Sequence, residues 1–165
     1  VCNQRYEFVR DAVSRAHPWN CLIRRVSVAA ESEAPAFEFT HQHSLPADPY
    51  CLRVLRPQDI DTIFRVEGRK ILSNTTPFAF IFIARVTDPN EYDQLLIETI
   101  AARLAADISY ALVNSATLTQ TLFALYDQKL SEARFVDATE GSPDNIVNQD
   151  RSLFVESDMF VSSRF

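Results

Sequence analysis

Three side chains in this sequence, His41, His43 and Cys51, have types and spacing that resemble metal ligands. In a β-strand His41 and His43 would point to the same side, as ligands of one ion must, and zinc prefers imidazole and thiolate. No second cysteine or carboxylate pair is spaced to complete a tetrahedral set. A small metal-dependent enzyme built on these residues is therefore an alternative hypothesis. The competing interpretation is a polar strand end before the proline-bearing stretch 45–49, with no bound metal or cofactor.

Motifs for other catalytic chemistry do not occur in the chain. It contains no G-x-S-x-G elbow, no phosphate-binding loop and no H-E-x-x-H sequence. With only two glycines, Gly68 and Gly141, a loop that cradles phosphate is practically excluded. We therefore predict a protein that is not an enzyme and has no catalytic residues. The remaining carboxylates are scattered and typical of solvated charges rather than an acid/base pair: Asp59, Asp61, Glu98, Asp107 and Asp127.

A short basic stretch surrounds the sequence Glu67-Gly68-Arg69, where a β-hairpin turn is predicted. The side chains at its tip could face phosphate or the acidic surface of a partner. The alternative is a charged turn that only keeps the hairpin solvated. We take three residues here as candidate partner contacts: Glu67, Arg69 and Lys70.

Composition and charge restrict the class of protein. With 47% hydrophobic residues and 23% charged residues, 165 residues can build the core of one domain. A net charge of −6 argues against a sequence-reading nucleic-acid binder, but it suits a surface along which DNA slides without sticking. The chain contains no window of about 18 uncharged apolar residues, so no membrane span is predicted. The three cysteines, an odd number without paired spacing, indicate free thiols in a reducing compartment.

Three helices are predicted, over residues 1–17, 89–114 and 116–139. His17-Pro18 ends the first, and Trp19 is expected to anchor the corner that follows. Asp88 as N-cap with Glu91 in a capping box would start the second. Ser115 or Thr117 would cap the third, which Gly141 would close. Within the second helix, Arg103 and Asp107 are four residues apart and are expected to pair on an exposed face.

Residues 21–87 have strand-like patterns instead. Alternation at Phe37 and Phe39 predicts a half-buried strand, and Gly68 marks the hairpin turn. Four to six strands inserted between one helix and a helical hairpin predict an α+β fold. The full set of predicted strands covers 22–28, 37–40, 50–55, 62–66, 70–73 and 78–86.

After Gly141 the periodicity fails, and we divide the chain into a domain at 1–141 and a C-terminal extension, or arm, at 142–165. The end of that extension is too short to bury its own apolar side chains. It could fold back on its own domain, or it could dock on a neighbouring subunit. The candidate partner contacts there are Leu153, Phe154, Val155, Met159, Phe160, Val161 and Phe165. The chain opens inside a helical pattern without a methionine, so we expect residues upstream of Val1.

Five strings follow one another along the chain: VRDAVSRAHPWNCLIRR (9–25), LPADPYCLRVL (45–55), VEGRKILSN (66–74), IARVTDPNEYDQLLIETIAARLAADISYALVNS (83–115) and YDQKLSEARFVDATEGSP (126–143). Taken in this order, they resemble one protein family, the tail tubular protein A or head-to-tail adaptors of short-tailed bacteriophages and related prophages. The resemblance covers roughly residues 5–143. Its departures are a missing helix before Val1, which family members usually carry, and a last stretch of about twenty residues unlike the family.

The resemblance implies a structural virion protein that assembles as a homo-oligomeric ring, usually a dodecamer, beneath the portal protein. Such a ring extends the DNA channel and receives the tail nozzle protein, with a tail fibre as a further possible partner. DNA would pass through without sequence-specific binding. The expected location is the tail or neck of the virion, and the host cytoplasm during assembly, with no membrane contact. A monomeric binding module with a self-docked tail is a further alternative.

Overall fold

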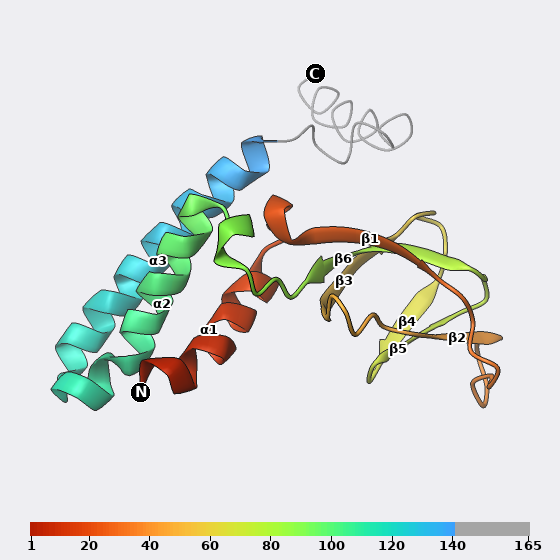
Figure 1. Cartoon of the computed structure of the whole chain (residues 1–165), viewed down its shortest axis with the longest axis horizontal. Coiled ribbons are helices and arrows are strands. Elements are labelled where there is room, and N and C mark those ends of the chain that lie inside the picture. The colour runs from red at the N-terminus through yellow and green to blue at the C-terminus, as the bar shows by residue number, and fades with distance from the viewer. Residues whose placement is uncertain (141–165) are drawn as a thin grey trace, which may run out of the picture. The chain divides into compact units, whose positions relative to one another are not determined.

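The computed structural model describes residues 1–140 of the chain. Within them lie three α-helices and six β-strands, in the order α1, β1 to β6, α2, α3 (Figure 1). The helices are α1 (Cys2–Ala16), α2 (Gln94–Val113) and α3 (Ala116–Thr139). This arrangement confirms the predicted α+β fold, with a β-region inserted between an N-terminal helix and a helical hairpin. The residues Val1–Arg134 form one compact unit. The predicted boundary after residue 141 and the extension at 142–165 lie outside the described residues.

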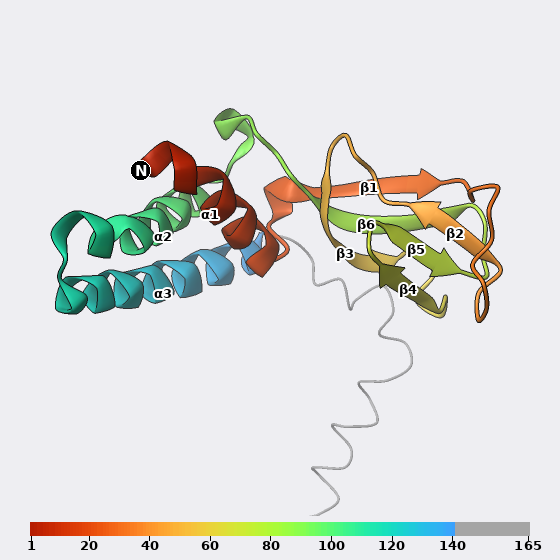
Figure 2. The ribbon, with the colours of Figure 1, turned by 90° about the horizontal axis from the view of Figure 1, so that it is seen from below.

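The β-region consists, in the described chain, of two antiparallel three-stranded sheets (Figure 2). The first has the order β1-β6-β3 and the second β2-β5-β4. The strands are β1 (Ile23–Val28), β2 (His41–Ser44), β3 (Cys51–Pro57), β4 (Phe64–Glu67), β5 (Lys70–Ser73) and β6 (Phe78–Ala84).

Strand β6 connects the two parts of the core because it is buried on both faces. Phe78, Phe80 and Phe82 lie on one face, in a cluster that Cys51 of β3 and Ile71 of β5 complete. Their rings follow one another at centroid distances of 5.7 Å. The alternate side chains point the other way, since successive residues of a strand face opposite sides. One of them, Ile83, belongs to the helical core.

The helical core joins all three helices. Trp19, which is fully buried, packs with residues of α1, α2 and α3. Its indole Nε1 donates a hydrogen bond to the Val13 carbonyl at 3.0 Å, and its ring meets the His17 ring edge-on. The predicted corner residue is thus confirmed. The buried helical residues around it are Val9, Val13, Leu96, Ile100, Tyr126 and Ala133.

The start of the second long helix differs from the prediction. Asp88 accepts a hydrogen bond from the Asn90 amide, but it caps only a short 3-10 helix, Pro89–Glu91. The helix α2 starts at Gln94, where Asp93 accepts hydrogen bonds from the amides of Leu95 and Leu96. The predicted capping box is wrong, because Glu91 instead forms an ion pair with Arg24 of β1 at 2.7 Å. Ser115 caps α3 as predicted, accepting from the Leu118 amide at 3.3 Å.

The strand predicted at 37–40 is also wrong. Phe37 is 79% exposed, and Glu38 has a φ of 74°, which no regular strand contains. The strand lies at His41–Ser44, whose four residues pair with the four residues of β5. Alternating hydrophobicity favoured the phenylalanines, but the pairing with β5 starts only at His41.

The predicted pair of Arg103 and Asp107 does not form. Asp107 pairs with Arg5 of α1 at 2.6 Å. The guanidinium of Arg103 lies 5.1 Å from the ring centroids of Phe123 and Tyr126 on α3. Spacing within α2 predicted a local pair, whereas the two neighbouring helices provide better partners for both charges.

Candidate functional site

The predicted hairpin tip is present, between β4 and β5. Gly68 and Arg69 form its turn, with Gly68 at a φ of 58°, which suits glycine. Arg69, however, donates hydrogen bonds to the carbonyls of Cys51 and Pro46, each at 2.7 Å. Lys70 pairs with Glu31 at 2.8 Å. Two of the three candidate contacts are therefore engaged within the chain, and Glu67 is exposed. Their contact with a partner stays a prediction.

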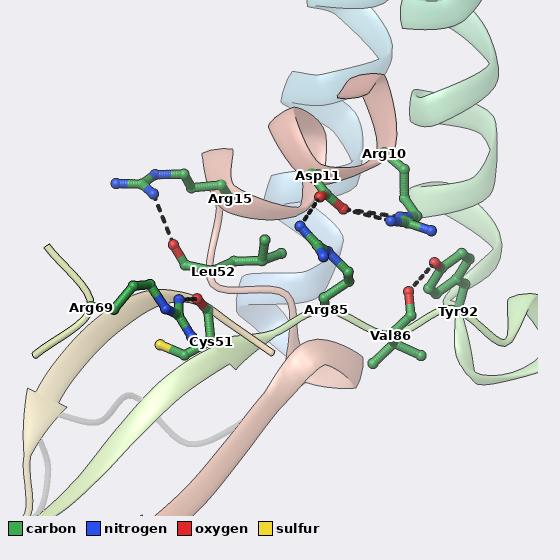
Figure 3. Close-up of polar contacts among 9 residues, drawn as sticks. All are labelled: Arg10, Asp11, Arg15, Cys51, Leu52, Arg69, Arg85, Val86 and Tyr92. Carbon is green, nitrogen blue, oxygen red and sulfur yellow. Dashed lines mark hydrogen bonds and ion pairs between the residues drawn. The ribbon is translucent and has the colours of Figure 1, made fainter. Parts of the chain in front are cut away.

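A pocket of about 630 Å³ lies beside this hairpin, between α1 and strand β3. It gathers residues from α1, β3, the hairpin and the segment just after β6. Figure 3 shows several of its arginines directed toward strand β3 and toward Asp11. The pocket is lined by Asp11, Ala12, Arg15, Leu45, Tyr50, Cys51, Leu52, Arg53, Val54, Val66, Gly68, Arg69 and Arg85.

Two arginines of the pocket hold neighbouring elements to the edge of β3. Arg15 of α1 donates to the Leu52 carbonyl at 2.8 Å, and Arg69 donates to the preceding carbonyl, that of Cys51 (Figure 3). The ring of Tyr50 lies between two cations, with the guanidinium carbons of Arg69 and Arg85 at 3.9 and 4.2 Å from its centroid. Because Arg15 and Arg69 are held by neutral carbonyls and not by carboxylates, these contacts leave their positive charges uncompensated.

The balance of charge in the pocket is strongly positive. Arg85 pairs with Asp11 at 2.6 Å, and Asp11 also accepts from Arg10 at 2.9 Å. The carboxylate of Asp11 is thus shared by two guanidinium groups. Arg15 and Arg53 have no carboxylate partner among residues 1–140, and the Nε of Arg85 is buried without a hydrogen-bond acceptor. This arrangement can bind carboxylate or phosphate groups.

The thiol of Cys51 lies in the same pocket but is almost completely buried. Burial raises its pKa, which outweighs the lowering effect of Arg69. The group therefore stays a protonated thiol at neutral pH, which makes it a poor nucleophile. The chemistry that the pocket supports is binding of anions. The prediction of free thiols is confirmed, since none of Cys2, Cys21 and Cys51 is in a disulfide.

The histidines of the metal hypothesis lie on β2, on the other sheet. Their rings share one side of the strand with centroids 6.5 Å apart. His43 is fully buried, 5.6 Å from the ring of Phe78, and neither of its ring nitrogens has a hydrogen-bond partner. Residues 1–140 contain no group of three or more histidines, cysteines and carboxylates that could hold a metal ion. Cys51 therefore does not form a metal-binding group with His41 and His43.

Helix α2 carries an apolar face that the described chain leaves partly uncovered. Five positions three or four residues apart share this face. Leu104 and Ile108 are half-buried, while the others are exposed, up to 62% for Leu112. We call this set the α2 face: Ile97, Ala101, Leu104, Ile108 and Leu112.

The charged side chains of α2 lie on its other sides. Glu98 pairs with Lys129 of α3 at 2.8 Å, Asp107 pairs with α1, and Arg103 covers aromatic rings of α3. The charged groups of α2 thus contact α1 and α3, Leu96 and Ile100 belong to the helical core, and the α2 face is left partly uncovered. On α3, Leu118 and Leu125 are seven residues apart on one side and are also exposed.

The apolar candidates at 153–165 lie outside the described residues, so their contacts stay predictions. Sequence reasoning missed the pocket, because its charged members are spread between Asp11 and Arg85 without a local pattern. It predicted a helix over 89–114, but not that the α2 face is left partly uncovered.

None of the helices in residues 1–140 combines the length and the hydrophobicity needed to cross a membrane. No protein-family model and no curated protein sequence matches the chain.

Proposed function

We propose that this protein is a structural head-to-tail adaptor of a short-tailed bacteriophage. Its copies would form a ring beneath the portal protein, extend the DNA channel and receive the tail nozzle protein. The proposal starts from the ordered sequence strings that resemble the adaptor family. The resemblance implies a helical bundle with an inserted β-region, and the α+β architecture agrees with that fold.

The observation that carries the proposal is the α2 face. Single exposed apolar residues are common on monomers, but a continuous apolar stripe along a five-turn helix is typical of a surface that another protein covers. Ring subunits need such a surface, because each copy contacts the next through a different face. Leu112 and Ile97 mark the two ends of the stripe, and both are exposed.

The helical hairpin has the stiffness that a ring subunit requires. Asp93 and Ser115 cap its helices. Inside the hairpin, the hydroxyl groups of Ser109 and Thr119 lie 2.8 Å apart, and Lys129 pairs with Glu98. Arg5 ties α1 to the same hairpin through Asp107. Because these contacts join all three helices, the α2 face is presented on a fixed support.

The experiment is negative-stain imaging of the full chain mixed with the portal protein of the same phage. The proposal expects a ring of adaptor density on one rim of the portal. A second sample lacks residues 150–165, and weaker attachment or incomplete rings are expected there. Portals without any added density would contradict the proposal. Normal co-sedimentation of the shortened chain with portal-bearing capsids would contradict the role of the arm.

A second candidate function is the metal-dependent enzyme of His41, His43 and Cys51, although residues 1–140 bring no three such side chains together as a metal site. The observation in its favour is His43, whose buried ring nitrogens lack hydrogen-bond partners. Elemental analysis of the purified protein separates the two candidates, because stoichiometric zinc or iron would favour the enzyme. The third candidate is a monomeric binding module. Light scattering in the presence of the portal distinguishes it from the adaptor, because it measures whether the chain stays monomeric or assembles.

A further inference from the structure

The pocket beside the hairpin holds more positive charge than its own fold requires. Arg15 and Arg69 satisfy carbonyls of β3, which accounts for their positions. The side chain of Arg53, on β3 at the pocket wall, is exposed and makes no hydrogen bond or ion pair within the described chain. The buried Nε of Arg85 is a further donor without an acceptor. Four arginines and one aspartate line the pocket, so an anionic ligand would compensate its excess of positive charge.

The size and lining of the pocket indicate what kind of anion fits. A volume of about 630 Å³ is far larger than one inorganic anion requires and is in the range of sites for larger ligands. Apolar side chains line the pocket together with the arginines. These apolar side chains are those of Leu45, Val54 and Val66. Val66 is 46% exposed. A ligand with carboxylates beside apolar side chains therefore matches the wall better than a phosphate backbone does.

One segment of this chain has that composition. Residues 153–161 read LFVESDMFV, in which Glu156 and Asp158 stand between two groups of large apolar side chains. In an extended segment, residues two positions apart point to the same side, so both carboxylates could face the arginines. The segment is acidic and the pocket is basic, although the whole chain carries a net charge of −6.

We propose that the pocket receives residues 153–161 of a second copy of the chain. Glu156 and Asp158 would bind Arg53 and Arg85, while the flanking apolar side chains would cover Leu45, Val54 and Val66. The contact would link neighbouring subunits through charge-assisted hydrogen bonds, which set the register between them. The inference rests on the proposed function in that it needs an assembly of several copies.

The test measures binding of a fluorescent peptide with the sequence of residues 150–165 to the full chain. The receiving chain carries E156Q and D158N, so that its own segment competes less for the pocket. Fluorescence anisotropy is expected to show saturable binding that weakens as salt is raised. A control peptide with the same two substitutions is expected to bind at least about tenfold more weakly.

A charge reversal at the pocket provides the matched comparison on the protein side. R53E in the receiving chain is expected to weaken peptide binding by about tenfold or more, because it repels both carboxylates. R65E is the control, since Arg65 is exposed on β4, does not line the pocket and changes the net charge equally. Circular dichroism of both variants checks that they fold as the parent chain does.

Equal binding of the acidic and the neutral peptide would overturn the inference, as would equal effects of R53E and R65E. Displacement of the peptide by short duplex DNA or by inorganic phosphate at lower concentration than by unlabelled peptide would overturn it as well. Portal rings without peptide binding would overturn this inference and leave the proposed function in place. Peptide binding without portal rings would support the inference and remove the proposed function.

Discussion

At the scale of single residues, Trp19 has the largest local effect on the helical core. Its ring is buried where α1 turns toward β1, and its Nε1 donates to the Val13 carbonyl, six residues earlier. This hydrogen bond holds a carbonyl near the end of α1, where no further helical amide follows. His17 packs against the ring edge. One side chain thus ends a helix and supplies a core contact.

Replacing Trp19 by alanine is expected to lower the free energy of unfolding by about 3–5 kcal/mol, the range for large aromatic residues in cores. Trp19→Phe keeps a ring but loses the donor to the Val13 carbonyl, so a smaller loss of about 1–3 kcal/mol is expected. Urea denaturation followed by circular dichroism measures both. Phe37→Ala, at an exposed loop position, is the control and should change little. Equal losses in all three variants would contradict the assigned role.

The ion pair of Arg5 and Asp107 predicts a dependence of stability on pH. The hydrogen bond from Arg5 holds the pKa of Asp107 below its ordinary value of 3.8. The pKa of Asp107 is lower in the folded protein than in the unfolded chain. The ion pair therefore stabilises the fold at pH values above the pKa of the unfolded chain, and this stabilisation is lost as the pH falls through the pKa of the folded protein. Asp107→Asn is therefore expected to be less stable than the parent at neutral pH.

The difference between parent and Asp107→Asn is expected to shrink as the pH is lowered below about 4, because Asp107 is protonated first in the unfolded chain and only at lower pH in the folded protein. Urea denaturation at a series of pH values measures it. Asp127→Asn is the control, because Asp127 is exposed on α3 and takes part in no ion pair among residues 1–140. A difference that stays constant down to the lowest pH would show that the ion pair is not its source.

At the scale of elements, the connection from β6 to α2 contains two helix N-caps, one for a short 3-10 helix and one for α2. Asp88 starts the short 3-10 helix, and Asp93 starts α2. Between them, the Tyr92 hydroxyl donates to the Val86 carbonyl at 2.5 Å (Figure 3). Burial raises the pKa of Tyr92 to about 12, so its hydroxyl stays a donor over the whole physiological range.

Asp93→Ala is expected to destabilise the protein by about 1 kcal/mol, since it removes the acceptor for two amides in the first turn of α2. Asp88→Ala removes a cap of a single 3-10 turn and should have the smaller effect. Equilibrium unfolding of both variants under identical conditions gives the comparison. A larger loss for Asp88→Ala would place the start of the helix at Pro89 instead.

At the scale of the whole molecule, the α2 face predicts self-association. Leu112→Glu places a charge on this face and is expected to prevent ring formation on the portal, because a buried interface disfavours an unpaired carboxylate. The free energy of unfolding of the single chain should change little, since Leu112 is 62% exposed. Negative-stain imaging and urea denaturation measure the two effects.

The matched control for Leu112→Glu is Gln128→Glu. Gln128 is exposed on α3 among polar neighbours and gives the same change in charge. It should leave the rings intact. Rings that form equally well with both variants would mean that the α2 face is not the interface between copies.

The sequence by itself determined the helices, the hairpin turn and the α+β class, because capping and hydrophobic periodicity act within a few residues. Ser115, Gly68 and the end of α1 at His17 all occupy their predicted roles. The apolar run from Phe78 was recognisable as a strand for the same reason. These features depend on neighbours in the chain and need no knowledge of distant contacts.

Only the tertiary structure decided the partners of charges and the register of strands. Asp107 forms an ion pair with Arg5 of α1 and not with Arg103 of its own helix. The position of strand β2 follows from its pairing with β5 and not from the hydrophobic pattern of residues 37–40. The pocket depends even more on distant parts of the chain, since Arg15, Arg53 and Arg85 meet only when α1 and the β-region pack together. The physical reason is that ion pairs, strand pairing and pockets join residues far apart in sequence, where local spacing carries no information.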